Sequence, residues 1–77
     1  MNLEPLAGEP TKEQIEAEPM LKWFRFAHLP AHLQAWSQPW AQLAVKVATD
    51  YPRNPERTVA LRKLLEGKDA GVRCTLP

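Results

Sequence analysis

The chain has 77 residues, a formal net charge of +1 and a single cysteine, Cys74. A chain of this length forms one small domain, and one cysteine excludes an internal disulfide. No hydrophobic run approaches the roughly 20 residues of a membrane span, and the N-terminus lacks the basic and apolar regions of a signal peptide. We therefore expect a cytosolic protein with no membrane partner, whose marginal core gains support from oligomerisation.

Charge is unevenly spread along the chain. Residues 1–20, the acidic N-terminal arm, contain five glutamates and one lysine. Residues 21–77, the body, contain nine lysines and arginines against four acidic residues. A basic, aromatic-rich body behind an acidic arm suits a protein that binds an anionic ligand. The same distribution suits an arm that only keeps the domain soluble, and composition does not choose between the two.

The first thirty residues predict little regular structure. Residues 1–10, MNLEPLAGEP, are rich in proline and glycine and predict a loop or disorder. Thr11 is a suitable N-cap for a helix of one or two turns that Pro19 ends. Residues 20–30, MLKWFRFAHLP, predict extended or irregular backbone, with Trp23 and Phe24 as packing residues.

Residues 31–49 predict the first long helix, and Pro30 suits its first helical position. Apolar residues recur along one face at three- and four-residue spacing. They are Leu33, Trp36, Trp40, Leu43, Ala44 and Val47. Pro39 removes a backbone donor inside this pattern. We therefore expect one kinked helix, or two short helices that meet at Ser37 as a cap.

Residues 55–73, PERTVALRKLLEGKDAGVR, predict the second long helix. Asn54 is a strong N-cap, and Pro55 fits the first helical position. One side of this helix carries Leu61, Leu64, Leu65, Lys68 and Val72. Gly67 and Gly71 weaken the helix towards its end. With no strand pattern anywhere, the sequence predicts an all-α fold, a helical hairpin with a short N-terminal helix.

The apolar stripes exceed what a helical hairpin can enclose. Each large apolar side chain left in water forgoes about 1.5–3 kcal/mol. Self-association would bury such side chains, so we expect a homo-oligomer. Its contacts should include Trp36, Trp40, Leu43 and Val47.

Aromatic and basic side chains gather just before the first long helix. Phe26 lies beside Arg25 and His28, where its ring could stack on a nucleobase or pack in the core. Free N–H groups at the following helix start favour phosphate. Ser37 suits either a cap or a ligand contact. The basic residues of the last helix suit either a solvated face or ligand contacts: Arg57, Arg62, Lys63, Lys68 and Arg73.

Catalysis and metal binding have little support in the sequence. There is no paired-carboxylate cleft and no Gly-rich phosphate loop, and His28, Asp69 and Cys74 are scattered. His28 and His32 are four residues apart, but Pro30 interrupts the spacing and no HExxH or CxxC motif accompanies them. We expect no enzyme activity, no metal and no cofactor.

The order of motifs resembles a family of small phage proteins that sequester the cyclic oligonucleotide signals of bacterial CBASS immunity. The resemblance covers about residues 23–75 and rests on FAHLP, LQAWSQPWAQLA and YPRNPERTVALRKLLEGKDAGVR. It implies a helical homohexamer in the host bacterial cytoplasm that binds its ligands without cleaving them. Cyclic dinucleotides would bind between paired protomers, and cyclic trinucleotides at separate three-fold sites.

The resemblance also implies which residues contact ligand. Cyclic dinucleotides would stack on Phe26, with His28 beside it and Ser37 facing the phosphates. Gln38 stands where the family often has a lysine, which weakens the expected phosphate contact. Cyclic trinucleotides would contact Arg73 and Thr75. No DNA or RNA polymer is expected as a partner.

Two other functions fit the same sequence. A small helical protein-interaction module would use exposed aromatic and leucine faces to bind a host protein. A nucleic-acid binder is favoured by the basic body and opposed by its modest charge excess. A response to cyclic but not linear oligonucleotides would separate these alternatives.

Overall fold

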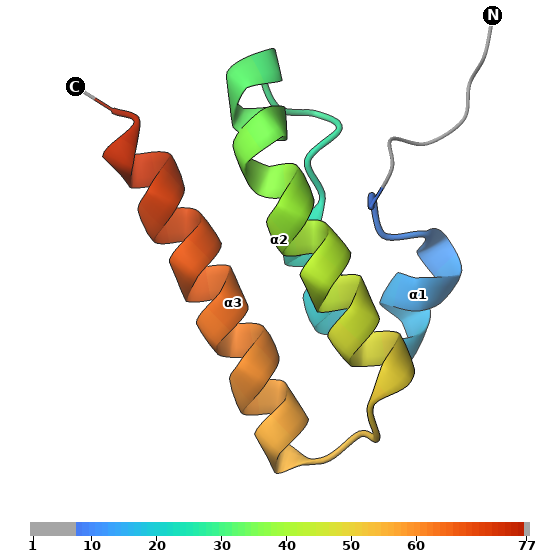
Figure 1. Cartoon of the computed structure of the whole chain (residues 1–77). Helices are drawn as coiled ribbons and strands as arrows, with labels where there is room; N and C mark the ends of the chain where they lie inside the picture. Colours follow the sequence, from blue (N-terminus) through green and yellow to red (C-terminus); the bar gives the residue numbers. More distant parts are fainter. Residues whose placement is uncertain (1–7, 77) are drawn as a thin grey trace, which may run out of the picture.

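The computed structural model describes residues 8–76, and all the regular structure in that range is helical (Figure 1). The elements are α1 (Lys12–Ala17), the 3-10 helix η1 (Pro19–Phe24), α2 (Ala31–Asp50) and α3 (Pro55–Cys74). α2 and α3 form an antiparallel hairpin, and η1 packs against both of them. The predicted all-α fold is confirmed. The expectation of a loop over residues 1–10 falls mostly outside the described range.

Two side-chain caps set helix starts as the sequence predicts. The Thr11 hydroxyl accepts a hydrogen bond from the Gln14 N–H at 3.1 Å, and the Gln14 side chain accepts one from the Thr11 N–H at 2.9 Å. The Asn54 side chain accepts from the Arg57 N–H at 2.9 Å, with Pro55 in the first turn. These contacts satisfy N–H groups that have no partner inside the helix.

Pro30 lies one position earlier than predicted, at the N-cap of α2 rather than in its first turn. Its φ of −56° is helical, but its ψ of 154° is extended. Proline fixes φ alone, so the ring is compatible with either position. α2 then continues through Pro39 to Asp50, so the division into two short helices at Ser37 does not occur.

Residues 19–24 form a 3-10 helix where the sequence predicted irregular backbone. Leu21 and Phe24 are buried and lie three positions apart, which matches the three residues per turn of a 3-10 helix. The side chains between them, Lys22 and Trp23, are exposed. Two inward residues are too short a pattern to distinguish from irregular backbone in the sequence.

Gly67 and Gly71 let α3 lie close to α2. A Cβ atom on Gly71 would lie 1.8 Å from Cζ2 of Trp36, and one on Gly67 would lie 2.8 Å from Cζ3 of Trp40. The Trp36 Nε1–H also donates a hydrogen bond to the Lys68 carbonyl oxygen at 2.9 Å. The glycines that weaken the helix by propensity are therefore the residues against which the two indole rings fit.

The fully buried residues of α2 are small, Ser37, Ala41 and Ala44, and of these only Ala44 belongs to the predicted apolar stripe. The buried apolar core consists of Leu21, Phe24, Phe26, Ala41, Ala44 and Leu61. Trp36 and Trp40 are half-buried against α3 of the same chain, whereas Leu43 is 45% exposed. Much of the surface expected to drive self-association is therefore used inside the chain.

A network of polar contacts, the turn-end network, closes the molecule where α2 turns into α3. The Arg57 guanidinium lies 3.0 Å from the Glu18 carboxylate, and both side chains are only 8% exposed. Arg57 Nη1 also donates to the carbonyl oxygens of Ala48 and Tyr51, each at 2.9 Å. The expectation that Arg57 belongs to a solvated face is wrong. Because Glu18 belongs to the N-terminal arm, the network ties that arm to the hairpin.

Candidate functional site

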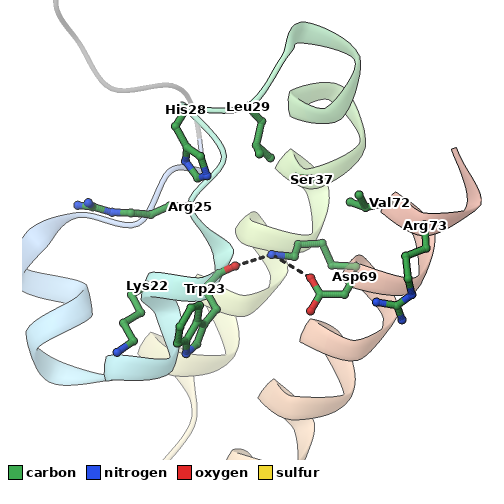
Figure 2. Close-up of a pocket in the computed structure, with 10 residues that line it drawn as sticks. Lys22, Trp23, Arg25, His28, Leu29, Ser37, Asp69, Val72 and Arg73 are labelled. Atoms are coloured by element: carbon green, nitrogen blue, oxygen red, sulfur yellow. Dashed lines mark hydrogen bonds and ion pairs between the residues drawn. The ribbon is translucent and has the colours of Figure 1, made fainter. Parts of the chain in front are cut away.

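A pocket of about 450 Å³ opens at the other end of the hairpin, where α2 begins and α3 ends (Figure 2). Its walls come from η1, residues 25–29, α2 and the C-terminal part of α3. The lining residues are Lys22, Trp23, Arg25, His28, Leu29, Ser37, Lys68, Asp69, Val72 and Arg73.

Positive charge dominates the lining. It contains four lysines and arginines, Lys22, Arg25, Lys68 and Arg73, and one carboxylate, Asp69. A cavity lined by one sign of charge concentrates ions of the opposite sign. The pocket is therefore suited to an anionic ligand.

Lys68 is the most deeply placed of these cations, with the residue only 8% exposed. Its ammonium donates a hydrogen bond to the Trp23 carbonyl oxygen and lies 3.5 Å from the Asp69 carboxylate. It also lies 5.4 Å from the centre of the Phe24 ring. An ammonium has three N–H groups, and the two oxygen contacts account for two of them. The ammonium therefore contributes a positive charge to the pocket wall.

Ser37 contributes an unsatisfied hydroxyl to the pocket. Its side chain is fully buried, and its Oγ makes no hydrogen bond with any residue in the range 8–76. Buried polar atoms are nearly always paired, and an unpaired one costs about 1–3 kcal/mol. Because Ser37 lies inside α2, its predicted role as a helix cap is wrong. Because the Oγ atom is not accessible to solvent, a ligand oxygen would become its partner only after a local shift of the pocket wall.

The pocket brings together three of the residues predicted from the sequence, His28, Ser37 and Arg73. They come from the loop before α2, from α2 and from α3. The resemblance assigned Arg73 to a different kind of site from His28 and Ser37. In this chain all three line one pocket.

The other three predicted residues lie outside the lining. Phe26 is 1% exposed and belongs to the core, so the expectation of a free stacking face on its ring is wrong for this chain. Arg25 has extended backbone (φ −64°, ψ 140°), which directs Phe24 and Phe26 to the same side. Gln38 is half-buried in α2. Thr75 caps α3, and its hydroxyl donates to the Val72 carbonyl oxygen at 2.7 Å.

Sequence reasoning missed Lys22, Trp23 and Arg25 as lining residues, and it named Lys68 only as one of five basic residues of the last helix. Trp23 was expected to pack in the core but is 57% exposed, with the Lys22 ammonium 4.9 Å from its ring centre. The sequence signal for the exposure of Trp23 was the spacing of Leu21 and Phe24. If both point inwards from a helical turn, Trp23 between them points outwards. Lys68 had a clearer signal, because its spacing already placed it on the apolar side of the last helix.

Glu9 holds the loop that carries His28. Its carboxylate accepts hydrogen bonds from the backbone N–H groups of Phe26, at 2.9 Å, and Ala27, at 3.2 Å. On the other side the Gln34 amide donates to the Ala27 carbonyl oxygen at 3.0 Å. The loop is thus fixed from both the N-terminal arm and α2, which sets the position of His28 at the pocket.

Residues 8–76 contain no group of three or more His, Cys, Asp and Glu side chains placed to hold a metal ion. No helix in the same range is long and apolar enough to cross a membrane. Compared with protein-family models, curated proteins and solved structures, the chain shows no significant match. The proposal for its function therefore rests on the pocket and on the sequence motifs.

Proposed function

We propose that this protein binds cyclic oligonucleotide second messengers in the pocket and sequesters them without cleaving them. One observation carries the proposal: residues expected from the sequence to contact such ligands, His28, Ser37 and Arg73, line one pocket with an excess of positive charge. A cyclic oligonucleotide presents anionic phosphodiester groups beside flat bases. Cations bind the phosphodiester groups, and an exposed aromatic ring stacks on the bases.

The pocket's polar groups favour binding over cleavage. Its one carboxylate, Asp69, is paired with Lys68. His28 also lines the pocket, but the Ser37 hydroxyl makes no hydrogen bond with it or with any other described residue. Activation of a hydroxyl requires a base within hydrogen-bond reach. By resemblance the protein is a phage anti-defence sponge that acts against CBASS immunity in the host bacterial cytoplasm.

Assembly into a homohexamer is part of the same proposal. The Cα extents of 36 × 35 × 15 Å describe a flat unit with little depth. Several large apolar side chains remain exposed on it: Trp23, Leu43, Tyr51, Val59 and Leu76. A cyclic dinucleotide has two equivalent halves, and a symmetric pair of protomers offers it two equivalent pockets. Light scattering at micromolar concentration should give a closed oligomer, and a monomer would overturn the shared-site arrangement.

A thermal-shift panel of cyclic di- and trinucleotides tests the binding proposal, with the matching linear dinucleotides as controls. Ligand that binds only the folded state raises the melting temperature. The protein should respond to cyclic forms and much less to linear ones. An equal response to both would favour the nucleic-acid binder, and no response would overturn the proposal.

Arg73→Ala gives the residue-level test. A charge-assisted contact to phosphate contributes about 1.5–3 kcal/mol, so this variant should lose most of its affinity. Arg62→Ala is the matched control, because Arg62 is an exposed arginine of α3 outside the lining. Ligand recovered after denaturation should be chemically unchanged, and linear product on chromatography would indicate an enzyme instead.

The exposed apolar side chains also favour a second candidate, a protein-interaction module that binds a host protein. This candidate makes no use of the charged pocket. Loss of partner binding in Leu43→Ser, with no response to any cyclic oligonucleotide, would favour it over the sponge.

A further inference from the structure

Trp23 is an exposed aromatic ring on a fixed backbone. It is 57% exposed, whereas its neighbour Phe24 is completely buried. The buried ammonium of Lys68 donates a hydrogen bond to the Trp23 carbonyl oxygen, which holds the end of η1 against α3. The indole is thus presented by backbone that is anchored directly after its Cα atom, at the Trp23 carbonyl group and at the buried Phe24. A ring held in this way loses little conformational freedom when it binds a flat ligand.

The other two tryptophans serve a different purpose. Trp36 and Trp40 are half-buried, and their rings fit against Gly71 and Gly67 of α3. Neither lines the pocket, and Phe26 is in the core. Among residues 8–76, Trp23 is therefore the one indole or phenyl ring in the pocket lining.

The surroundings of Trp23 suit a base that carries a phosphate. The Lys22 ammonium lies 4.9 Å from the ring centre. Figure 2 shows Trp23 on η1 and Arg73 on α3, on different walls of the same pocket. A ligand could therefore place a base on the indole while its phosphate faces the cations of the opposite wall.

We propose that Trp23 is the base-stacking residue of this site and that it selects purines over pyrimidines. The proposal rests on the function proposed above, because it assumes a cyclic oligonucleotide ligand. The two fused rings of indole overlap a two-ring purine more fully than a one-ring pyrimidine. Stacking contributes through that overlap, so a purine ligand gains more from Trp23.

Calorimetry on Trp23→Ala tests the stacking role, with a cyclic dinucleotide of two adenosines as the probe. Loss of one stacked base should weaken binding about 5- to 150-fold, the equivalent of about 1–3 kcal/mol. Tyr51→Ala is the matched control, because Tyr51 is 56% exposed and lies outside the pocket lining. It should bind as the unmodified protein does. A cyclic dinucleotide of two uridines should bind the unmodified protein more weakly than the adenosine form.

Trp23→Phe supplies a second readout that does not depend on a large loss of affinity. Base stacking on an indole quenches its fluorescence, so ligand should quench the unmodified protein. Trp23→Phe retains one aromatic ring for packing and leaves Trp36 and Trp40 as the emitters. Quenching by ligand should disappear in this variant while binding persists.

The outcomes separate the two proposals. If the unmodified protein binds no cyclic oligonucleotide, the proposed function fails and the role of Trp23 fails with it. If it binds and Trp23→Ala binds equally well, or if quenching persists in Trp23→Phe, only the role of Trp23 is overturned. Equal affinity for the adenosine and uridine ligands would overturn the purine preference.

Discussion

The two ends of the α2–α3 hairpin each bury a cation of α3, and the two cations have different partners. At the turn end Arg57 meets the Glu18 carboxylate at 3.0 Å and two backbone carbonyl oxygens. At the open end Lys68 meets the Trp23 carbonyl oxygen and Asp69, in a pocket with three further cations. The first arrangement pairs the buried charge with a buried carboxylate. The second leaves positive charge in excess.

The same two cations also fasten η1 at both its ends. Arg57 contacts Glu18, the residue before η1, and Lys68 contacts the carbonyl group of Trp23 near its last turn. Arg57 and Lys68 are about three helical turns apart on α3, so they lie on one face of that helix. The comparison teaches that a cation can fasten the fold and also serve a second purpose, because Lys68 lines a pocket whereas Arg57 does not.

Arg57→Ala should have the largest effect on stability. It leaves the Glu18 carboxylate buried, with Arg53, at 4.0 Å, as its one remaining ion-pair partner within residues 8–76. Breaking a buried ion pair by removing one partner costs about 3–5 kcal/mol. Urea denaturation should show this loss, with Arg62→Ala as the exposed control. A loss below about 1 kcal/mol would mean that the turn-end network contributes no more than a surface ion pair.

Lys68→Met should change stability less and ligand binding more. Methionine retains much of the apolar stem but leaves the Trp23 carbonyl oxygen without its donor, at a cost of about 1–3 kcal/mol. Affinity for a cyclic dinucleotide should fall by at least tenfold in calorimetry, at a temperature where circular dichroism shows the variant folded. Unchanged affinity would make Lys68 a structural residue only, as Arg57 is.

Gly71→Ala tests whether the open end requires the close approach of the two helices. A Cβ atom 1.8 Å from the Trp36 ring forces that ring to move. Overpacking costs about 1–3 kcal/mol, and the gain in helix propensity offsets nearly 1 kcal/mol of it. We expect a net loss of up to about 2 kcal/mol by thermal denaturation. Gly67→Ala, with a milder overlap at the edge of Trp40, should be close to neutral, and equal losses would contradict this assignment.

Ser37→Ala should have the smallest effect on stability and the opposite sign. Removing a buried hydroxyl that has no described partner should stabilise the protein by up to about 1 kcal/mol. The same change should weaken ligand binding, because the ligand loses its buried hydroxyl partner. A variant that is both less stable and equally tight for ligand would show that the hydroxyl serves the fold.

Local signals predicted most of the helices. The N-caps at Thr11 and Asn54 and the spacing of apolar residues identify α1 and α3, because capping depends on neighbours a few residues away. The fit of Trp36 against Gly71 was not predictable in this way. It depends on contact between residues far apart in the sequence, and the sequence alone suggests only that glycine weakens a helix.

The site was predictable only in part, because its shape also depends on contacts between residues far apart in the sequence. Ser37 and Arg73 were expected to contact ligand and do line the pocket. Phe26, for which both packing and stacking were open, is buried, whereas Trp23, which was expected to pack, is exposed. Which of two nearby aromatic rings is buried depends on where η1 ends and the backbone becomes extended. That boundary carries no distinct residue pattern.

The contact that Glu9 makes with the loop of residues 25–29 has a practical consequence for shortened proteins. The first ten residues of the acidic arm look dispensable, because a protein that begins at Thr11 would keep the cap of α1 and the residues of every helix. It would also uncover the N–H groups of Phe26 and Ala27, with the Arg25 side chain close by. Adjacent free N–H groups beside a guanidinium attract any small anion. Sulfate or phosphate from a buffer would then bind the shortened protein at these N–H groups. Ligand affinities measured on it would include binding at a site that Glu9 covers in the longer chain.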